Sequence, residues 1–144
     1  MRQFSIATIM TLLILLTSTA YAQTGTVDVK VTQIDVKEGG KIKIGIYDSK
    51  GFPSFGKEVA GIDIEVKETS ATYIFKNIPA GKYAIAVFQD SNVDGKLNKN
   101  MFGVPKEPYG FSNNKYGKFG PPDFEDVSFD VKEDTSTSLT INLK

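Results

Sequence analysis

One acidic run in the sequence, DSNVDGKLN at residues 90–98, has the residue types and spacing of a metal-binding loop. A calcium loop places oxygen-bearing side chains at positions 1, 3, 5 and 9, a glycine at position 6 for the sharp turn, and a backbone carbonyl at position 7. The run meets each requirement, so we predict calcium as its cofactor, with magnesium, which needs fewer protein ligands, as the alternative. The predicted ligands in the run are Asp90, Asn92, Asp94, Lys96 through its carbonyl, and Asn98.

The run departs from an EF-hand at position 12, where a bidentate glutamate is needed and this chain has Met101. A carboxylate from elsewhere would have to complete the shell, and we predict Glu107 for that role. Asp, Asn and Gly also form turns by hydrogen-bonding their own backbone, so a plain turn without metal stays open as the alternative. The other carboxylates that could fold back onto the run are Asp48, Asp123, Glu125 and Asp126.

Aromatic residues recur between glycines and prolines after the acidic run, over residues 101–129. Exposed rings would form a platform for a glycan or a peptide, because they offer flat, amphipathic contact area. A long ordered loop must also bury something to offset its entropy, so we expect the phenylalanine rings to fold back as a satellite core. The candidate ligand-binding residues are Tyr109, Phe111, Asn113 and Tyr116.

Composition excludes several functional classes. The chain has no cysteine and no histidine, which removes Ser-His-Asp triads, Cys-His nucleophiles and zinc sites of the usual kind. Arg2 is the only arginine and the formal net charge is zero, which argues against nucleic-acid binding. A hydrolase using paired carboxylates, such as Glu107 with Glu125 or Asp126, stays as a minor alternative. We therefore expect a non-catalytic protein.

The first 22 residues have the pattern of a secretory signal peptide. Arg2 supplies the positive start, residues 6–16 are almost wholly apolar, and Ala20-Tyr21-Ala22 is a small-x-small cleavage site. We expect export to the periplasm or outer surface of a bacterium, with no membrane span after cleavage. Residues 23–144 are then long enough for one self-sufficient domain.

The rest of the chain alternates apolar and polar residues with the period of two that is typical of strands. Seven such segments, and no helical periodicity longer than a turn, predict an all-β, seven-stranded antiparallel β-sandwich with one long ordered loop at residues 89–123. The predicted strands are TVDVKVTQIDV (26–36), KIKIGIY (41–47), GIDIEV (61–66), SATYIFKN (70–77), KYAIAVF (82–88), DVSFDV (126–131) and SLTINL (138–143).

Three segments, FKNIPAGKYAIAVFQDSNVDGKL, FGVPKEPYGFSNN and FGPPDFEDVSF, resemble the successive motifs of the DUF2141 family of exported bacterial proteins. The resemblance runs from about Gly25 to the C-terminus. It implies an immunoglobulin-like or prealbumin-like sandwich and attaches no catalytic role to any residue. Family members often have His-Asp where this chain has Gln89-Asp90, so any role of that imidazole is absent or replaced here.

Two functional hypotheses follow for the exported domain. In the first, a non-catalytic module with a calcium-organised loop presents a ligand-binding face. In the second, a structural module docks an envelope protein by β-augmentation, through an edge strand or residues 48–60. The expected partner is an envelope protein or a glycan, and we expect a monomer.

Overall fold

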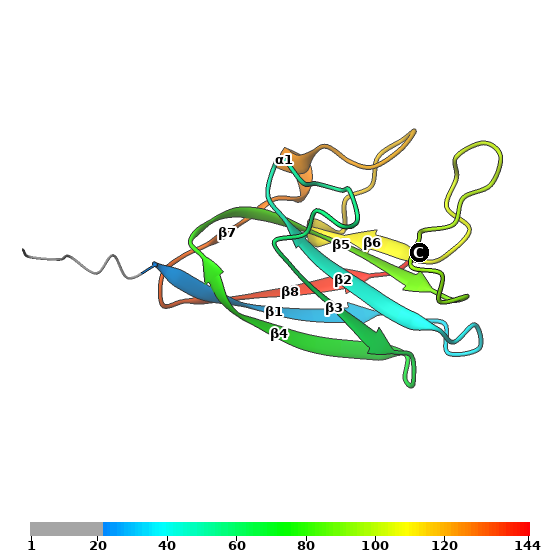
Figure 1. Ribbon diagram of the computed structural model, residues 1–144, viewed down its shortest axis with the longest axis horizontal. Helices are drawn as coiled ribbons and strands as arrows, with labels where there is room; N and C mark the ends of the chain where they lie inside the picture. The colour runs from blue at the N-terminus through cyan, green and yellow to red at the C-terminus, as the bar shows by residue number, and fades with distance from the viewer. Residues whose placement is uncertain (1–21) are drawn as a thin grey trace, which may run out of the picture.

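The computed structural model describes residues 22–144, which form eight strands in two sheets (Figure 1). The predicted signal peptide, residues 1–22, lies outside the described residues apart from Ala22. Within the described part of the chain, no helix has the length and apolar character needed to cross a membrane. The strands are β1 (Thr24–Thr32), β2 (Lys41–Tyr47), β3 (Ala60–Glu65), β4 (Ser70–Pro79), β5 (Gly81–Asp90), β6 (Tyr109–Phe111), β7 (Phe129–Val131) and β8 (Ser136–Asn142).

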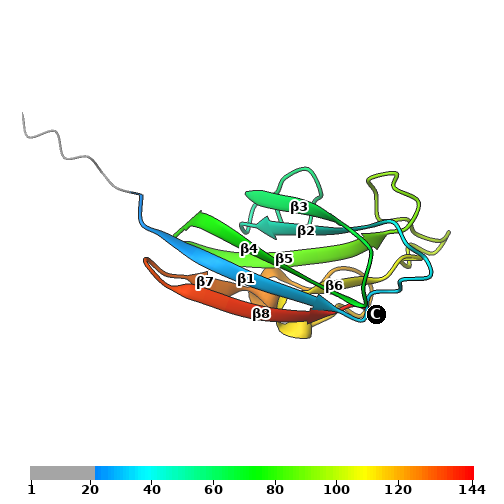
Figure 2. The same ribbon diagram turned by 90° about the horizontal axis from the view of Figure 1, so that it is seen from below.

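The smaller sheet has the strand order β4-β1-β8 (Figure 2). Strand β1 pairs with β4 in antiparallel orientation and with β8 in parallel orientation, so the prediction of a wholly antiparallel arrangement was wrong for this pair. Because side chains alternate along a strand, Val27, Val29 and Val31 all point to one face, where each is fully buried. These valines belong to one hydrophobic core that also contains side chains of the larger sheet, such as Ile44 and Ile85.

The larger sheet has the order β3-β2-β5-β6, and β7 pairs with the beginning of β5. All of its pairs are antiparallel. Strand β5 is buried without interruption from Tyr83 to Asp90, as expected for a central strand covered on both faces. Ile85 faces the shared core, whereas Ala84 and Ala86 join a second cluster on the opposite face.

The second cluster covers the outer face of β5 with aromatic rings from the loops. Phe52 and Phe55 come from residues 48–59, between β2 and β3, and Phe111 and Phe124 come from the segment that follows the acidic run. Phe55 packs edge-on against Phe88, with ring centroids 4.5 Å apart. The satellite core expected of the long loop is therefore present for Phe111 and Phe124, and Phe52 and Phe55 complete it.

The expectation was wrong for two other phenylalanines, Phe102 and Phe119, which lie exposed at loop tips. The loops that carry them, residues 98–106 and 115–121, project from the body of the protein (Figure 1).

Eight strands are present where seven were predicted. The additional strand, β6, spans three residues around Gly110, too few for an alternation to be recognised. It can pack there because Gly110 lacks a side chain, since a Cβ would lie 2.7 Å from Cγ2 of Ile141.

Two predicted strands are shorter than expected. Strand β1 ends at Thr32 instead of residue 36, because the next residue, Gln33, takes a positive φ of 61°. The segment 126–131 begins as the short helix α1 (Phe124–Val127). As a result Val127 packs in the second cluster, while Val131 belongs to the shared core.

Replacing Ile85 by alanine tests the double-sided burial of β5. Ile85 is fully buried, so the cavity should lower the free energy of unfolding by about 2–5 kcal/mol. The matched control is Ile74→Ala on β4, whose side chain is 48% exposed and should change stability far less. Chemical denaturation of both variants measures the difference, and equal losses would contradict the assignment of β5 as the central strand.

Candidate functional site

The acidic run closes on itself around the carboxylate of Asp90, at the end of β5. This side chain is 1% exposed and accepts hydrogen bonds from the backbone N–H groups of Asp94 (3.1 Å) and Gly95 (2.8 Å). Gly95 has φ of +78°, a conformation that glycine adopts without strain. Gly95 thus forms the sharp turn at position 6 of the loop.

A second buried carboxylate, Glu107, joins the two ends of the loop. Its Oε1 accepts the N–H of Ser91 at 3.0 Å and its Oε2 accepts the N–H of Asn98 at 2.9 Å. Glu107 therefore lies against the acidic run, where its carboxylate binds two backbone donors.

Asp94 is the exposed carboxylate of the loop. It accepts hydrogen bonds from Nδ2 of Asn98 (3.0 Å), from the N–H of Lys96 (2.9 Å) and from Nδ2 of Asn92 (3.1 Å). These donors, with that of Asn98 foremost, lower the pKa of Asp94. Since the folded-state pKa is the lower one, the contribution of these bonds to stability is present at neutral pH and is lost only as the pH falls through that pKa.

The other carboxylates considered for this loop lie elsewhere. In the strand register, Asp90 lies opposite Lys41 at one end of β2, whereas Asp48 follows Tyr47 at the other end. Glu125 forms an ion pair of 3.1 Å with Lys82, at the beginning of β5. Between residues 22 and 144, no group of three or more His, Cys, Asp or Glu residues is arranged to hold a metal ion.

The same arrangement separates the carboxylates proposed for a hydrolase. Glu107 binds next to the end of β5, while Glu125 and Asp126 lie in α1, beside its beginning. A strand rises by about 3.3 Å per residue, so the nine steps from Lys82 to Ser91 span roughly 30 Å. Paired carboxylates in glycoside hydrolysis are about 5–9.5 Å apart, so the structure does not bring this pair together.

Two of the predicted ligand-binding residues hold the fold together through internal hydrogen bonds. Asn113 donates to the carbonyls of Asp126 (3.3 Å) and Ser128 (3.0 Å). The Tyr116 hydroxyl donates to the carbonyl of Asn142 at 2.7 Å, and burial raises its pKa.

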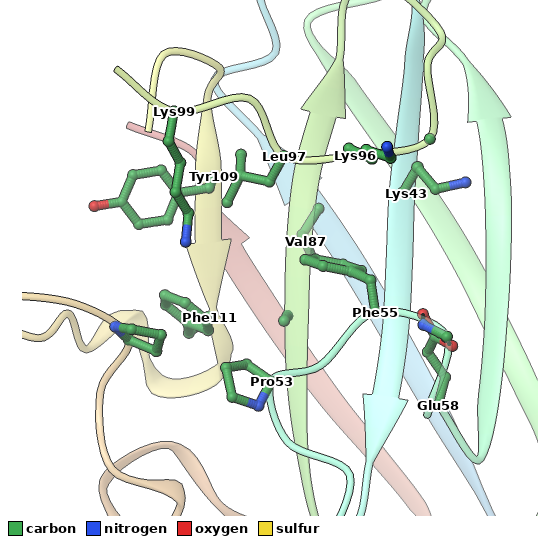
Figure 3. Close-up of a pocket in the computed structure, with 14 residues that line it drawn as sticks. Lys43, Pro53, Phe55, Glu58, Val87, Lys96, Leu97, Lys99, Tyr109 and Phe111 are labelled. Atoms are coloured by element: carbon green, nitrogen blue, oxygen red, sulfur yellow. Dashed lines mark hydrogen bonds between the residues drawn. The ribbon is translucent and has the colours of Figure 1, made fainter. Parts of the chain in front are cut away.

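The other two, Tyr109 and Phe111, line a cleft of about 650 Å³ on the outer face of the larger sheet (Figure 3). Apolar side chains, including Phe55 and Ala86, form its floor. Lysines from β2 and from the acidic run stand at its rim. The lining residues are Lys43, Pro53, Phe55, Gly56, Glu58, Ala86, Val87, Gly95, Lys96, Leu97, Lys99, Tyr109, Phe111 and Pro121.

One wall of the cleft is set by the loop between β2 and β3. Glu58 of this loop accepts a hydrogen bond from the Tyr47 hydroxyl at 3.1 Å, and burial together with the charge of Glu58 raises the pKa of Tyr47. The Tyr47 ring fits because Gly45 has no side chain, since a Cβ would lie 2.7 Å from it. This partly buried hydrogen bond thus fixes the loop over the sheet.

Sequence reasoning missed most of this cleft. It named Tyr109 and Phe111 as ligand-binding residues but not Lys99, and it named Lys96 only for its carbonyl. One signal was readable: Lys43 alternates with buried isoleucines, which places it on the outer face of β2. The meeting of three separate segments had no sequence signature.

A family described as "Uncharacterized protein conserved in bacteria" (DUF2141) matches residues 29–140, which cover most of the chain and nearly all of the described fold. The chain belongs to the DUF2141 family. No curated protein and no solved structure matches it.

In this DUF2141 protein, Gln89 occupies the position before Asp90. Its side chain donates to the carbonyls of Asp35 (2.6 Å) and Gly39 (2.8 Å) and accepts the N–H of Asp35 at 3.0 Å. The side chain is fully buried with its hydrogen-bonding groups satisfied, and it fixes the β1–β2 connection. Gln89 therefore has a structural role here.

Replacing Asp90 by alanine tests the closure of the acidic run. The change leaves the N–H groups of Asp94 and Gly95 without their acceptor, so we expect stability to fall by about 2–4 kcal/mol. Asp130→Ala, on the exposed face of β7, is the matched control and should be nearly neutral. Urea denaturation in the presence of chelator measures both, and a neutral Asp90→Ala variant would contradict this role.

Proposed function

We propose that the protein is an exported, non-catalytic β-sandwich module that binds an amphipathic anion in the cleft on the outer face of its larger sheet. The observation that carries the proposal is the combination of an aromatic floor with a lysine rim in a cleft of about 650 Å³. Small-molecule sites are typically apolar hollows of this size with a few placed polar groups. An apolar body would lie on Phe55 and Phe111, and its anionic group would meet the lysines.

The charges around the cleft support an anionic ligand. Lys43 is ion-paired with Asp63 at 2.7 Å and points away from the aromatic rings (Figure 3). Among the described residues Lys99 forms no such pair, and its side chain reaches toward Phe111 (Figure 3). The only carboxylate lining the cleft, Glu58, accepts hydrogen bonds from the Gly56 N–H at 2.9 Å and from Tyr47. Lys96 also forms no such pair among the described residues, and we favour Lys99 as the ligand's contact because its side chain reaches toward the aromatic rings.

The core that the two sheets share supports the proposed sandwich architecture. Side chains of β1, β4 and β8 pack with those of β2 and β5 in one cluster. At one edge the sheets are also joined, because Tyr109 of β6 and Lys144 exchange two backbone hydrogen bonds of 3.2 and 3.1 Å. The fold implied by the family resemblance is consistent with this arrangement.

Titration with 1-anilinonaphthalene-8-sulfonate, an apolar ring system with one sulfonate, tests the cleft. We expect saturable binding that weakens about tenfold in Lys99→Ser, since a charge-assisted contact contributes about 1.5–3 kcal/mol. Lys132→Ser, which removes an exposed lysine outside the cleft, is the matched control and should bind as the unaltered protein does. Fluorescence titration gives the dissociation constant for each protein. Equal binding by all three proteins would rule out Lys99 as the anion contact.

Calcium binding by the acidic run is a second candidate function. It is favoured by the clustering of Asn92 and Asn98 around Asp94, which gathers oxygen-bearing side chains at one point. Because few of the oxygens carry charge, we propose a weak site with a dissociation constant of about 10⁻⁴–10⁻³ M, as in extracellular modules.

Thermal unfolding with and without calcium tests this site. At ten times the dissociation constant, bound calcium would stabilise the fold by about 1.4 kcal/mol, which raises Tm by a few degrees. We expect the rise to vanish in Asp94→Asn and to persist in Asp130→Asn. If the Tm is the same in calcium and in chelator, the acidic run is a turn closed by its own hydrogen bonds and not a calcium site.

The edge strands of the two sheets favour the alternative of an assembly module. Strands β3 and β4 each form an outer edge of their sheet, and an edge strand offers unpaired backbone groups to a partner strand. The opposite edge, at β8, is covered, because Asn114 binds the Thr140 carbonyl (2.9 Å) and the Asn142 N–H (2.8 Å). An envelope protein would therefore add its strand at β3 or β4.

A further inference from the structure

Two loops of the protein carry exposed apolar side chains at their tips. On the loop of residues 98–106, Met101 is 89% exposed and Phe102 is 83% exposed. On the loop of residues 115–121, Phe119 is fully exposed. Val104, on the first loop, is also 55% exposed, so three neighbouring apolar side chains are exposed there, and such a cluster points to a partner.

The two tips rise on the same side of the protein (Figure 1). The loops that carry them also border one cleft, which is lined by Lys96, Leu97 and Lys99 before the first tip and by Pro121 after the second. One surface could therefore meet both tips at once.

The exposure of the first tip is imposed by hydrogen bonds. Oδ1 of Asn100 accepts the N–H groups of Phe102 (2.9 Å) and Val104 (3.0 Å), and the Asn100 N–H donates to the Val104 carbonyl at 2.9 Å. Below this turn, the Lys106 N–H donates to the Asn98 carbonyl at 2.8 Å. The tip is thus a closed hairpin that holds Phe102 away from the body of the protein.

The second tip is a tight turn of the backbone. Gly117 lies against the carbonyl of Gly120, so closely that a side chain at position 117 would collide with it. Lys118 and Phe119 are held between these two glycines, at the outermost point of the loop. The backbone geometry of this turn therefore places the ring of Phe119 in solvent.

The two segments that form the tips are basic, although Asp123 and Asp126 lie beside Phe119. Segments 96–106 and 115–121 contain five lysines and no acidic residue, although the whole chain has 17 basic and 17 acidic residues. All five lysines are exposed. They are Lys96, Lys99, Lys106, Lys115 and Lys118.

We propose that the two tips dock the protein onto an anionic lipid bilayer, with Phe102 and Phe119 inserted at the interface and the lysines on the headgroups. A protein interface needs a continuous, complementary surface of about 800 Å² per partner, which two separate tips do not form. A bilayer adapts to isolated side chains, and lysine stems lie along its apolar boundary while their charges reach anionic groups. Insertion of the two phenylalanines is separate from the cleft ligand, because neither ring lines the cleft, whereas Lys96 and Lys99 border both sites.

Co-sedimentation with vesicles tests the docking. We expect binding to vesicles of equal parts phosphatidylglycerol and phosphatidylcholine, and at least tenfold weaker binding to pure phosphatidylcholine, because each lysine near the surface contributes about fivefold. Phe102→Ser/Phe119→Ser should lose at least tenfold on the anionic vesicles. The matched control, Val59→Ser/Ile74→Ser, removes two exposed apolar side chains from other parts of the protein and should bind unchanged.

Three outcomes would overturn the proposal: no vesicle binding by the unaltered protein, equal binding by the two double variants, or equal binding to anionic and neutral vesicles. A dimer seen by sedimentation velocity that disappears in Phe102→Ser/Phe119→Ser, without vesicle binding, would assign the tips to a second copy of the chain instead. Binding of 1-anilinonaphthalene-8-sulfonate by the same variant separates this result from the cleft, since it should be unaffected.

Discussion

The burial of β5 on both faces is the constraint on which the rest of the structure depends. Its side chains are buried from Tyr83 to Asp90, so the strand needs apolar cover on each side. The smaller sheet supplies that cover for Ile85, and loop aromatics supply it for Ala84 and Ala86. This accounts for the order of loops that have little regular structure, because ordering them is offset by the burial of rings such as Phe55. The cleft is the place where this cover stays open over the small side chain of Ala86.

The same strand also ends in two buried polar residues, and their hydrogen-bonding needs shape the loops around it. Gln89 binds the connection before β2, and Asp90 binds the loop that follows β5. A buried carboxylate without donors would be strongly destabilising, so the loop must present its N–H groups. A metal loop uses the same carboxylate and the same glycine turn. The sequence of residues 90–98 therefore does not distinguish a metal-binding loop from a turn closed by its own hydrogen bonds. The distinction lies in the groups that the carboxylates of Asp90 and Glu107 bind.

Much of the fold could be predicted from the sequence where burial has a regular period. Residues 41–47 were predicted with the bounds that β2 has, and the all-β class follows from similar alternation elsewhere. The prediction failed where a single residue acts through distant contacts. Gly110 creates β6 by fitting under Ile141, and Val127 turns away from the shared core in α1. The cleft escaped prediction for a related reason, because Lys43, Phe55 and Lys99 come from three segments that only the tertiary structure brings together.

The cleft proposal and the bilayer proposal concern the same pair of loops. The cleft lies at the base of these loops, and the bilayer would meet their tips. At the base, Glu107 and Asp90 fix the first loop to the sheet, and residues there line the cleft. At the tip, the hydrogen bonds of Asn100 hold Phe102 outward. A preformed hairpin avoids the entropic cost of ordering a loop on docking, which favours binding by otherwise weak contacts. A bilayer held by the tips would also lie close to the cleft, and amphipathic anions concentrate at such a boundary. The two sites would then act in sequence on one class of compound, with the lipid surface supplying what the cleft receives.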